Sequence, residues 1–401
     1  MKSKAVVAVL FLACVYSSIT AESVQNYTAG HYQFSYPENY TGIEDIADIF
    51  NRAWNTFNEF FRFDSVPSQH VCKVVILADK TEFNSYLIER IGKTRDQYVF
   101  LKYSRPELSE LVLYVGDTDF GYNAFAGPVL NRQLFLQYLY GFVAEPPIWL
   151  RDGFQGYFEQ MQYDEKTDNF LTGGYSPWLE TVKKLHIDPE KNISAEGILS
   201  ALTGTYEAAL FYPQAWAFVS FLLNTEKSDY QRFLYETCIL LEDTDRFNDK
   251  SQQENTDLIK NRFLKFHTVQ QTDADFSLWL SSQHTFSELL QAGVSAYNQE
   301  DYKKAETELN TALSIRNDDP ILVYYLGLVS YAEKRYPDAE GWYKKALGFG
   351  ADVSTVNWAL GLNAFADKRY DDARKFLETA ISLNPDRYTG KAEELLNSMP
   401  K

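Results

Sequence analysis

Histidine and cysteine are scarce in this sequence, and their scarcity limits the chemistry that the chain can perform. Only five histidines and three cysteines occur among 401 residues. Three cysteines are too few for a fold held together by disulfides. No histidines, cysteines and acidic residues cluster at the spacings typical of metal ligands. The sequence leaves open whether Cys72 pairs with Cys238.

Positive charge is also in short supply. Lysine and arginine total 38 against 55 aspartates and glutamates, which gives a formal net charge of −17. Such a chain is repelled by the phosphate backbone of nucleic acids, and an anionic membrane surface does not attract it. The composition therefore argues against a nucleic-acid partner.

Long apolar runs are absent beyond the N-terminus. The run Ala5–Val15 follows two lysines and precedes the small-residue site Ile19–Ala21, which predicts a signal peptide over 1–21. This run is too short to span a bilayer. In a second interpretation, Leu10–Cys14 resembles a relaxed bacterial lipobox, with a lipid anchor on Cys14. Both interpretations predict an exported protein without a transmembrane helix, located in the periplasm or attached to the envelope.

What the sequence does have is a 34-residue period near its C-terminus. Four columns of residues each recur three times at this spacing. A period of this kind predicts stacked helical hairpins, because each hairpin buries its apolar stripe only against its neighbours. The columns are Gly293, Gly327 and Gly361; Tyr302, Tyr336 and Tyr370; Ala305, Ala339 and Ala373; and Ala312, Ala346 and Ala380.

The pattern resembles tetratricopeptide repeats, with "DYKKAETELNTAL", "RYPDAEGWYKKAL" and "RYDDARKFLETAI" as the second helix of each unit. Pro385 closes the third unit, as is usual for that family. We expect an all-α array over 285–390 and a C-terminal cap over 391–401. The three repeats are expected at 286–319, 320–353 and 354–387.

The resemblance implies that the first helix of each repeat lines a groove that binds a protein or peptide partner. The groove would be apolar and aromatic, which suits an extended or helical apolar peptide. In the alternative interpretation, the groove packs against the preceding domain of the same chain. The implied groove residues are Leu290, Val294, Tyr297, Tyr324, Leu328, Tyr331, Trp358, Leu362 and Phe365.

The first two-thirds of the chain combines strand and helix periodicities. An amphipathic helix is expected over 43–63 and a second helix over 80–92, ending at Gly92. The region from 123 to 280 is expected to be mostly helical apart from a polar loop over 243–257. We therefore expect an α+β lobe over 22–122 and a helical lobe over 123–280, so that the whole chain is mostly helical. The expected strands are 30–36, 72–79, 96–104 and 110–117.

One stretch of this region, "PPIWLRDGFQGYFE", resembles the motif P-x-W-L-x-E-G-x-A-x-Y-x-E of gluzincin peptidase MA-like domains. The segment 212–223, "YPQAWAFVSFLL", is similar to the helix that follows in that family. The resemblance covers about residues 29–240 and implies a gluzincin-like fold for 22–280. In active members, H-E-x-x-H supplies two zinc ligands and a general base, and a glutamate on the next helix supplies the third ligand. The matching motif residues are Pro147, Trp149, Leu150, Gly153, Tyr157 and Glu159.

The residues at these positions do not suit zinc in this chain. The segment "QLFLQ" (Gln133–Gln137) aligns with H-E-x-x-H, so that Gln133 and Gln137 replace the two ligands and Leu134 replaces the base. An amide oxygen is a poor zinc donor, and leucine cannot take a proton. Asp152 stands at the third ligand position. No histidine lies between residues 71 and 185, so no other alignment restores the site.

The sequence thus predicts an exported pseudo-metallopeptidase that acts as a binding or scaffold protein, with no catalytic residue, metal or cofactor. Asp152 is expected to pair with Arg132 or Arg151, or to cap its helix. Either the repeat groove or a cleft between the two N-terminal lobes would hold the partner. The alternative is an envelope peptidase or hydrolase with a displaced or non-zinc site. The sequence does not identify the partner or the oligomeric state.

Overall fold

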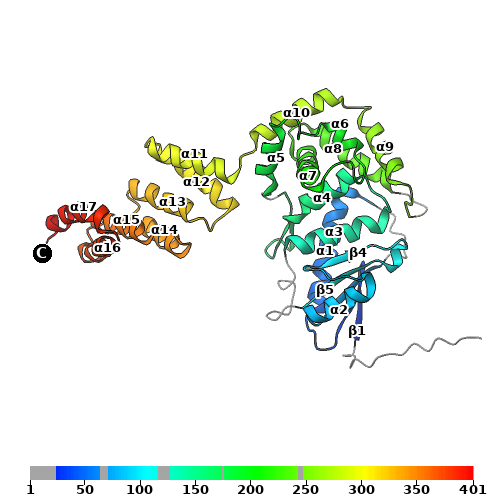
Figure 1. The fold of residues 1–401 in the computed structure, drawn as a ribbon, viewed down its shortest axis with the longest axis horizontal. Coiled ribbons are helices and arrows are strands. Elements are labelled where there is room, and N and C mark those ends of the chain that lie inside the picture. The colour runs from blue at the N-terminus through cyan, green and yellow to red at the C-terminus, as the bar shows by residue number, and fades with distance from the viewer. Residues whose placement is uncertain (1–23, 64–70, 116–126, 174–175, 243–246, 401) are drawn as a thin grey trace, which may run out of the picture. The chain divides into compact units, whose positions relative to one another are not determined.

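The computed structural model describes residues 24–63, 71–115, 127–173, 176–242 and 247–400. They form two compact units, one ending at Trp279 and the other beginning at Leu280. The chain is mostly helical, with a small sheet near its N-terminal end and only helices in the C-terminal unit (Figure 1). Within these ranges, no helix has the length and apolar character needed to cross a membrane. The expected signal peptide and Cys14 lie outside the described residues.

A five-stranded mixed sheet forms the base of the N-terminal unit. The strand order is β1-β2-β3-β5-β4, in which β2, β3 and β5 are parallel and the edge strands β1 and β4 are antiparallel to their neighbours. The four expected strands are present. The edge strand β1 was not predicted, because its polar residues do not alternate with apolar ones. The strands are β1 (Val24–Ala29), β2 (Tyr32–Pro37), β3 (Cys72–Leu77), β4 (Val99–Leu101) and β5 (Glu110–Tyr114).

Helices cover both faces of this sheet, and alternate strand residues point to opposite faces. On one face, Tyr32 and Phe34 of β2 pack their rings on Phe50 of α1 (Ile43–Phe61). On the other face, Val112 of β5 shares a buried cluster with Phe83 of α2 (Lys80–Ile91). The sheet therefore lies between two separate apolar layers, one under α1 and one under α2.

A layer of aromatic rings joins α1 to the helical lobe. Phe57 of α1 lies 5.6 Å from Phe135 of α3 and 4.8 Å from Phe158 of α4, between ring centroids. Phe61 of α1 lies 4.7 Å from Phe154 of α4. These rings are buried and contribute hydrophobic area as well as tilted ring contacts. Aromatic residues make up 16% of the chain, and these five rings use part of that content to hold the two lobes of this unit together.

The helical lobe is a set of short helices packed around α7. Its elements are α3 (Pro128–Phe142), α4 (Ile148–Glu159), the hairpin β6 (Gln162–Asp164) and β7 (Asn169–Leu171), α5 (Trp178–His186), α6 (Ala195–Ser200), α7 (Ala208–Asn224), α8 (Ser228–Cys238), α9 (Gln252–Phe263) and α10 (Val269–Ser282). Pro106–Leu108 and Ile239–Leu241 form single 3₁₀ turns. The helix α4 crosses α7 closely at Gly153, where there is no room for a side chain. A Cβ at this position would lie 2.6 Å from the backbone oxygen of Ala215.

The prediction of a polar loop over 243–257 is partly wrong, because α9 already begins at Gln252. Ser251 and Glu254 form a capping box, in which each side chain bonds the backbone N–H of the other residue. Such a box is a strong helix start signal. The polar composition of this segment hid that signal in the sequence.

The C-terminal unit consists of three helical hairpins and a final helix. The hairpins are α11 (Phe286–Asn298) with α12 (Tyr302–Ile315), α13 (Pro320–Ala332) with α14 (Tyr336–Gly348), and α15 (Val353–Ala366) with α16 (Tyr370–Leu383). Each hairpin also contacts the next along the chain, as Figure 1 shows. The last helix, α17, spans Pro385–Ser398, so it starts before the cap boundary expected at 391.

Candidate functional site

Gln133 and Gln137 of α3 bond the backbone of the sheet. The Oε1 of Gln133 accepts a hydrogen bond of 2.8 Å from the backbone N–H of Phe100 in β4. The Nε2 of Gln137 donates one of 2.7 Å to the backbone carbonyl of Lys73 in β3. Residues four apart lie on one face of a helix, and here that face joins α3 to the sheet. Leu134, at the expected general-base position, is fully buried.

Asp152 of α4 pairs with its neighbour Arg151, which is one of the pairings that the sequence suggested. The Nε of Arg151 donates to Oδ1 of Asp152 at 2.6 Å, and another of its nitrogens donates to the Tyr140 hydroxyl at 3.5 Å. The ring of Tyr140 in turn stacks on Phe100. These contacts connect Asp152 through Arg151 and Tyr140 to Phe100 of β4, the residue that Gln133 also bonds. Gln137 is bonded to β3 instead.

A polar contact between Tyr212 and Glu159 joins α7 to α4. The hydroxyl of Tyr212 donates to Glu159 at 3.3 Å. Burial, together with the nearby carboxylates of Glu159 and Asp152, raises the pKa of Tyr212 far above its ordinary value, although the charge of Arg132 opposes this. Tyr212 therefore keeps its proton at neutral pH and donates it in the hydrogen bond to Glu159. Glu159 and Tyr212 both lie in segments that the sequence analysis singled out, but their pairing across 53 positions was not predicted.

Among the scarce histidines and cysteines, His186 has hydrogen-bond partners, and the two cysteines in the described part of the chain are not paired with each other. Both ring nitrogens of His186 lie within hydrogen-bond distance of other side chains, at 3.0 Å from Asn192 and 3.1 Å from Ser277. Cys72 and Cys238 are free thiols, and burial raises the pKa of Cys72 to about 12. Across the described ranges, no three histidine, cysteine or acidic side chains are grouped so that they could hold a metal ion.

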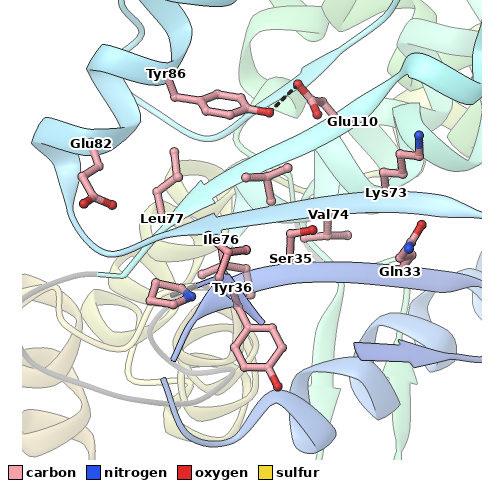
Figure 2. Close-up of a pocket in the computed structure, with 13 residues that line it drawn as sticks. Gln33, Ser35, Tyr36, Lys73, Val74, Ile76, Leu77, Glu82, Tyr86 and Glu110 are labelled. Atoms are coloured by element: carbon pink, nitrogen blue, oxygen red, sulfur yellow. Dashed lines mark hydrogen bonds between the residues drawn. The ribbon is translucent and has the colours of Figure 1, made fainter. Parts of the chain in front are cut away.

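A pocket of about 580 Å³ lies on the face of the sheet that α2 only partly covers (Figure 2). Figure 2 shows Tyr86 of α2 and Glu110 of β5 pointing toward each other, and the tyrosine hydroxyl donates to the carboxylate at 2.9 Å. Arg90 pairs with the same carboxylate at 3.4 Å. Lys73 also lines the pocket, without an ion-pair partner among the described residues. No histidine or cysteine lines the pocket, and neither do Gln133, Leu134, Gln137 or Asp152.

The C-terminal unit has a different kind of candidate surface, on the first helices of its hairpins. On α11, α13 and α15, side chains at i, i+4 and i+7 are half-buried, whereas the opposite side of each helix is buried in the core. We name these residues the aromatic face. Successive first helices contact each other, so their exposed sides adjoin. The aromatic face consists of Leu290, Val294, Tyr297, Tyr324, Leu328, Tyr331, Trp358, Leu362 and Phe365.

The rings of the aromatic face are held in place by rings behind and beside them. Tyr297 meets Tyr325 edge to face at 5.7 Å between centroids. Tyr324 packs on the buried ring of Tyr343 at 5.7 Å. Such contacts fix the direction of each ring while one side of it stays accessible. Burial raises the pKa of Tyr324 to about 12, so its hydroxyl is a neutral donor at physiological pH.

The far end of the aromatic face is bounded by α17. The ring of Trp358 stacks on Tyr388 of α17 at 5.2 Å, with an interplanar angle of 23°. The hydroxyl of Tyr388 and the guanidinium of Arg387 both lie 3.3 Å from the Thr355 hydroxyl. Tyr388 is buried, so α17 caps the last hairpin and leaves Trp358 half-exposed.

The C-terminal unit matches a known protein family. Models of the tetratricopeptide repeat match residues 290–354 and 354–387. The C-terminal unit carries tetratricopeptide repeats. Comparison with curated proteins gave no match.

Two solved structures are similar to parts of the chain. The N-terminal domain of stress-induced protein-1 (STI-1) from C. elegans is 20% identical over 27% of this chain and 93% of that one, with a TM-score of 0.25. The APC/C hetero-tetramer Cut9-Hcn1 is 11% identical over 55% of this chain and 38% of that one, with a TM-score of 0.27. Because both TM-scores are low, the assignment of the repeats rests on the family models.

Ion pairs join one tetratricopeptide repeat to the next. Arg335, between the helices of the second repeat, lies 2.5 Å from Glu306 of the first repeat. Arg369, its equivalent in the third repeat, lies 2.5 Å from Glu340 of the second. Both arginines are about one-third exposed and also contact carboxylates of their own repeat. These networks connect neighbouring repeats at equivalent positions.

The glycine column is what lets the two helices of each repeat cross closely. A Cβ at Gly327 would lie 2.5 Å from the buried, rigid ring of Tyr343, whereas a Cβ at Gly341 on the outer side of α14 would meet nothing within 4 Å. We expect Gly327→Ala to destabilise the repeats by about 1–2 kcal/mol, because the overpacking exceeds the gain in helix propensity. Gly341→Ala should stabilise them by about 0.5–1 kcal/mol. Calorimetric unfolding of the full chain measures both, and equal effects of the two variants would contradict this packing.

Proposed function

We propose that this protein is an exported, non-catalytic scaffold that binds a protein partner through its tetratricopeptide repeats. The observation that carries the proposal is the aromatic face: nine half-buried, mostly apolar side chains on three adjoining helices. Aromatic side chains that are partly accessible and fixed in position are the usual anchors of protein interfaces. The export signal at 1–21 would place this surface in the periplasm or at the envelope.

The N-terminal unit, in this proposal, is a gluzincin-like domain that has lost its metal site. Its support is the use made of the two glutamines at the ligand positions, since Gln133 and Gln137 both bond strand backbone. The Oε1 of Gln133 already accepts from the N–H of Phe100, so it could bind a metal only by leaving that N–H unpaired. Gln137 is held through its Nε2, which donates to the carbonyl of Lys73. Leu134 provides no base, and Asp152 is neutralised by Arg151.

The binding role is tested by crosslinking the mature chain in its native envelope and mapping the crosslinked residues by mass spectrometry. We expect a discrete protein partner whose crosslinks fall on α11, α13 and α15. Crosslinks confined to other surfaces, or a repeat unit without any partner, would contradict the proposed role.

The loss of the metal site predicts that purified mature protein contains no stoichiometric zinc. We expect elemental analysis to find well below one zinc per chain after dialysis against buffer containing zinc. A chelator should leave the unfolding temperature unchanged, since no folding energy depends on a bound metal. One tightly held zinc per chain would contradict the proposal and favour the hydrolase alternative.

A further inference from the structure

The aromatic face carries no positive charge, which restricts what it can recognise. The helices α11, α13 and α15 contain no lysine, arginine or histidine. Their single acidic residue, Glu288, is used in the capping box at the start of α11. A partner recognised by an acidic motif or a terminal carboxylate needs cations to pair with it. These helices therefore favour an uncharged segment of the partner. The nearby Arg387 lies on α17 at the end of the face, where its guanidinium bonds the Thr355 hydroxyl and lies over the ring of Tyr388.

Three tyrosines of the aromatic face offer hydroxyl groups as well as rings. Tyr297, Tyr324 and Tyr331 are half-buried, and none of their hydroxyls bonds another described residue. Neighbouring rings orient Tyr297 and Tyr324, while Tyr331 packs against Tyr336. Each hydroxyl is thus a positioned donor that a ligand carbonyl can satisfy.

A ligand must have free carbonyls to use these donors. An α-helix binds most of its own carbonyls internally, whereas a polyproline II segment has no internal hydrogen bonds and exposes every carbonyl. Polyproline II also has a turn of about 9 Å, from three residues with a rise of 3.1 Å each. Packed helices lie about 8–10 Å apart, so every third residue of such a segment would fall on successive first helices.

Resting on the proposed function, we propose that the aromatic face binds an uncharged, proline-rich segment of the partner in the polyproline II conformation. The flat rings of Tyr324 and Trp358 receive the proline rings, and the tyrosine hydroxyls bond the exposed carbonyls. Aromatic grooves that recognise proline-rich segments combine the same two features. Because such a segment is already extended before it binds, little conformational entropy is lost.

Titration of the full mature chain with synthetic peptides tests this inference, with the heat of binding in isothermal titration calorimetry as the signal. The probe is an uncharged peptide of about twelve residues with repeating Pro-Pro-Ala. The controls are a peptide of equal length with the prolines replaced by glycine and an uncharged amphipathic helical peptide. We expect the proline peptide to bind at least about tenfold more tightly than either control.

Two variants distinguish the contribution of a tyrosine hydroxyl to binding from that of an aromatic ring. Tyr324→Phe should weaken binding of the proline peptide about three- to tenfold, since one hydrogen bond is lost and the ring is kept. Tyr27→Phe, which removes a hydroxyl from β1 in the other unit, should leave the affinity unchanged. Trp358→Ala should weaken binding at least about tenfold.

The two proposals fail in different ways. If the helical peptide binds more tightly than the proline peptide and Trp358→Ala weakens it, this inference is wrong and the proposed binding role survives. An unchanged affinity for the proline peptide in both Tyr324→Phe and Trp358→Ala would also overturn the inference. If crosslinking of the native envelope finds no partner on the repeats, the proposed function itself fails.

Discussion

Gly153→Ala is expected to lower the stability of the N-terminal unit by about 3 kcal/mol, the upper end of the usual cost of overpacking. A Cβ at this position would lie 2.5 Å from Val219 Cγ2 and 2.6 Å from the backbone oxygen of Ala215. The side chain of Val219 could turn away, but the backbone of α7 could not move without disturbing the buried residues on both sides of it. The helices α4 and α7 would have to separate along their contact.

Thermal unfolding followed by circular dichroism measures this effect, with Gly141→Ala as the matched control. Gly141 lies inside α3, and a Cβ there would meet nothing within 4 Å. The control should be neutral or slightly stabilising, because alanine favours a helix over glycine. For a unit of this size we expect Gly153→Ala to lower the melting temperature by roughly 6–12 °C. Equal melting temperatures for the two variants would show that α4 and α7 do not cross as closely as described.

The double variant Tyr324→Ala with Trp358→Ala is expected to weaken binding of the protein partner about a hundredfold or more. Each truncation removes an anchored ring from the aromatic face, and hot-spot aromatic residues each contribute about 2 kcal/mol or more. A matched control removes two exposed apolar side chains elsewhere in the repeats, Phe349 and Leu383, which are 41% and 53% exposed. The control should bind as the unaltered chain does.

Circular dichroism must accompany this comparison, because Tyr324 also packs on Tyr343 inside the second repeat. We expect the double variant to keep its helical signal and to lose only a part of its stability. A partner that binds the double variant and the control equally well would contradict the role of the aromatic face.

The repeats could be predicted from the sequence because each repeat uses the same local rule. Gly293, Gly327 and Gly361 recur at one spacing, and each lies where its two helices cross. Both the helices and the side that they expose follow from this period. The boundary of α17 was less accurate, because Pro385 both closes the third repeat and begins the next helix.

The N-terminal unit was predicted less completely, since its polar contacts join distant residues. The partners of Gln133 and Gln137 are backbone groups 33 and 64 positions away. Nothing in the local pattern of "QLFLQ" indicates that either amide bonds a strand. That these residues do not suit zinc is a prediction from their side-chain chemistry, whereas their bonds to the strands became visible only in the fold. The hairpin β6–β7 was missed for another reason, because each of its strands has only three residues.

Site-specific photocrosslinking tests most directly the central claim that the aromatic face binds a partner. A photoreactive amino acid replaces Leu328, at the middle of the face, or Leu383, at the exposed end of α16, in the full chain produced in its native cells. We predict a crosslink from position 328 to another protein, and none from position 383. A crosslink from position 328 only to the N-terminal unit of the same chain would contradict the claim, because the face would then be an internal contact.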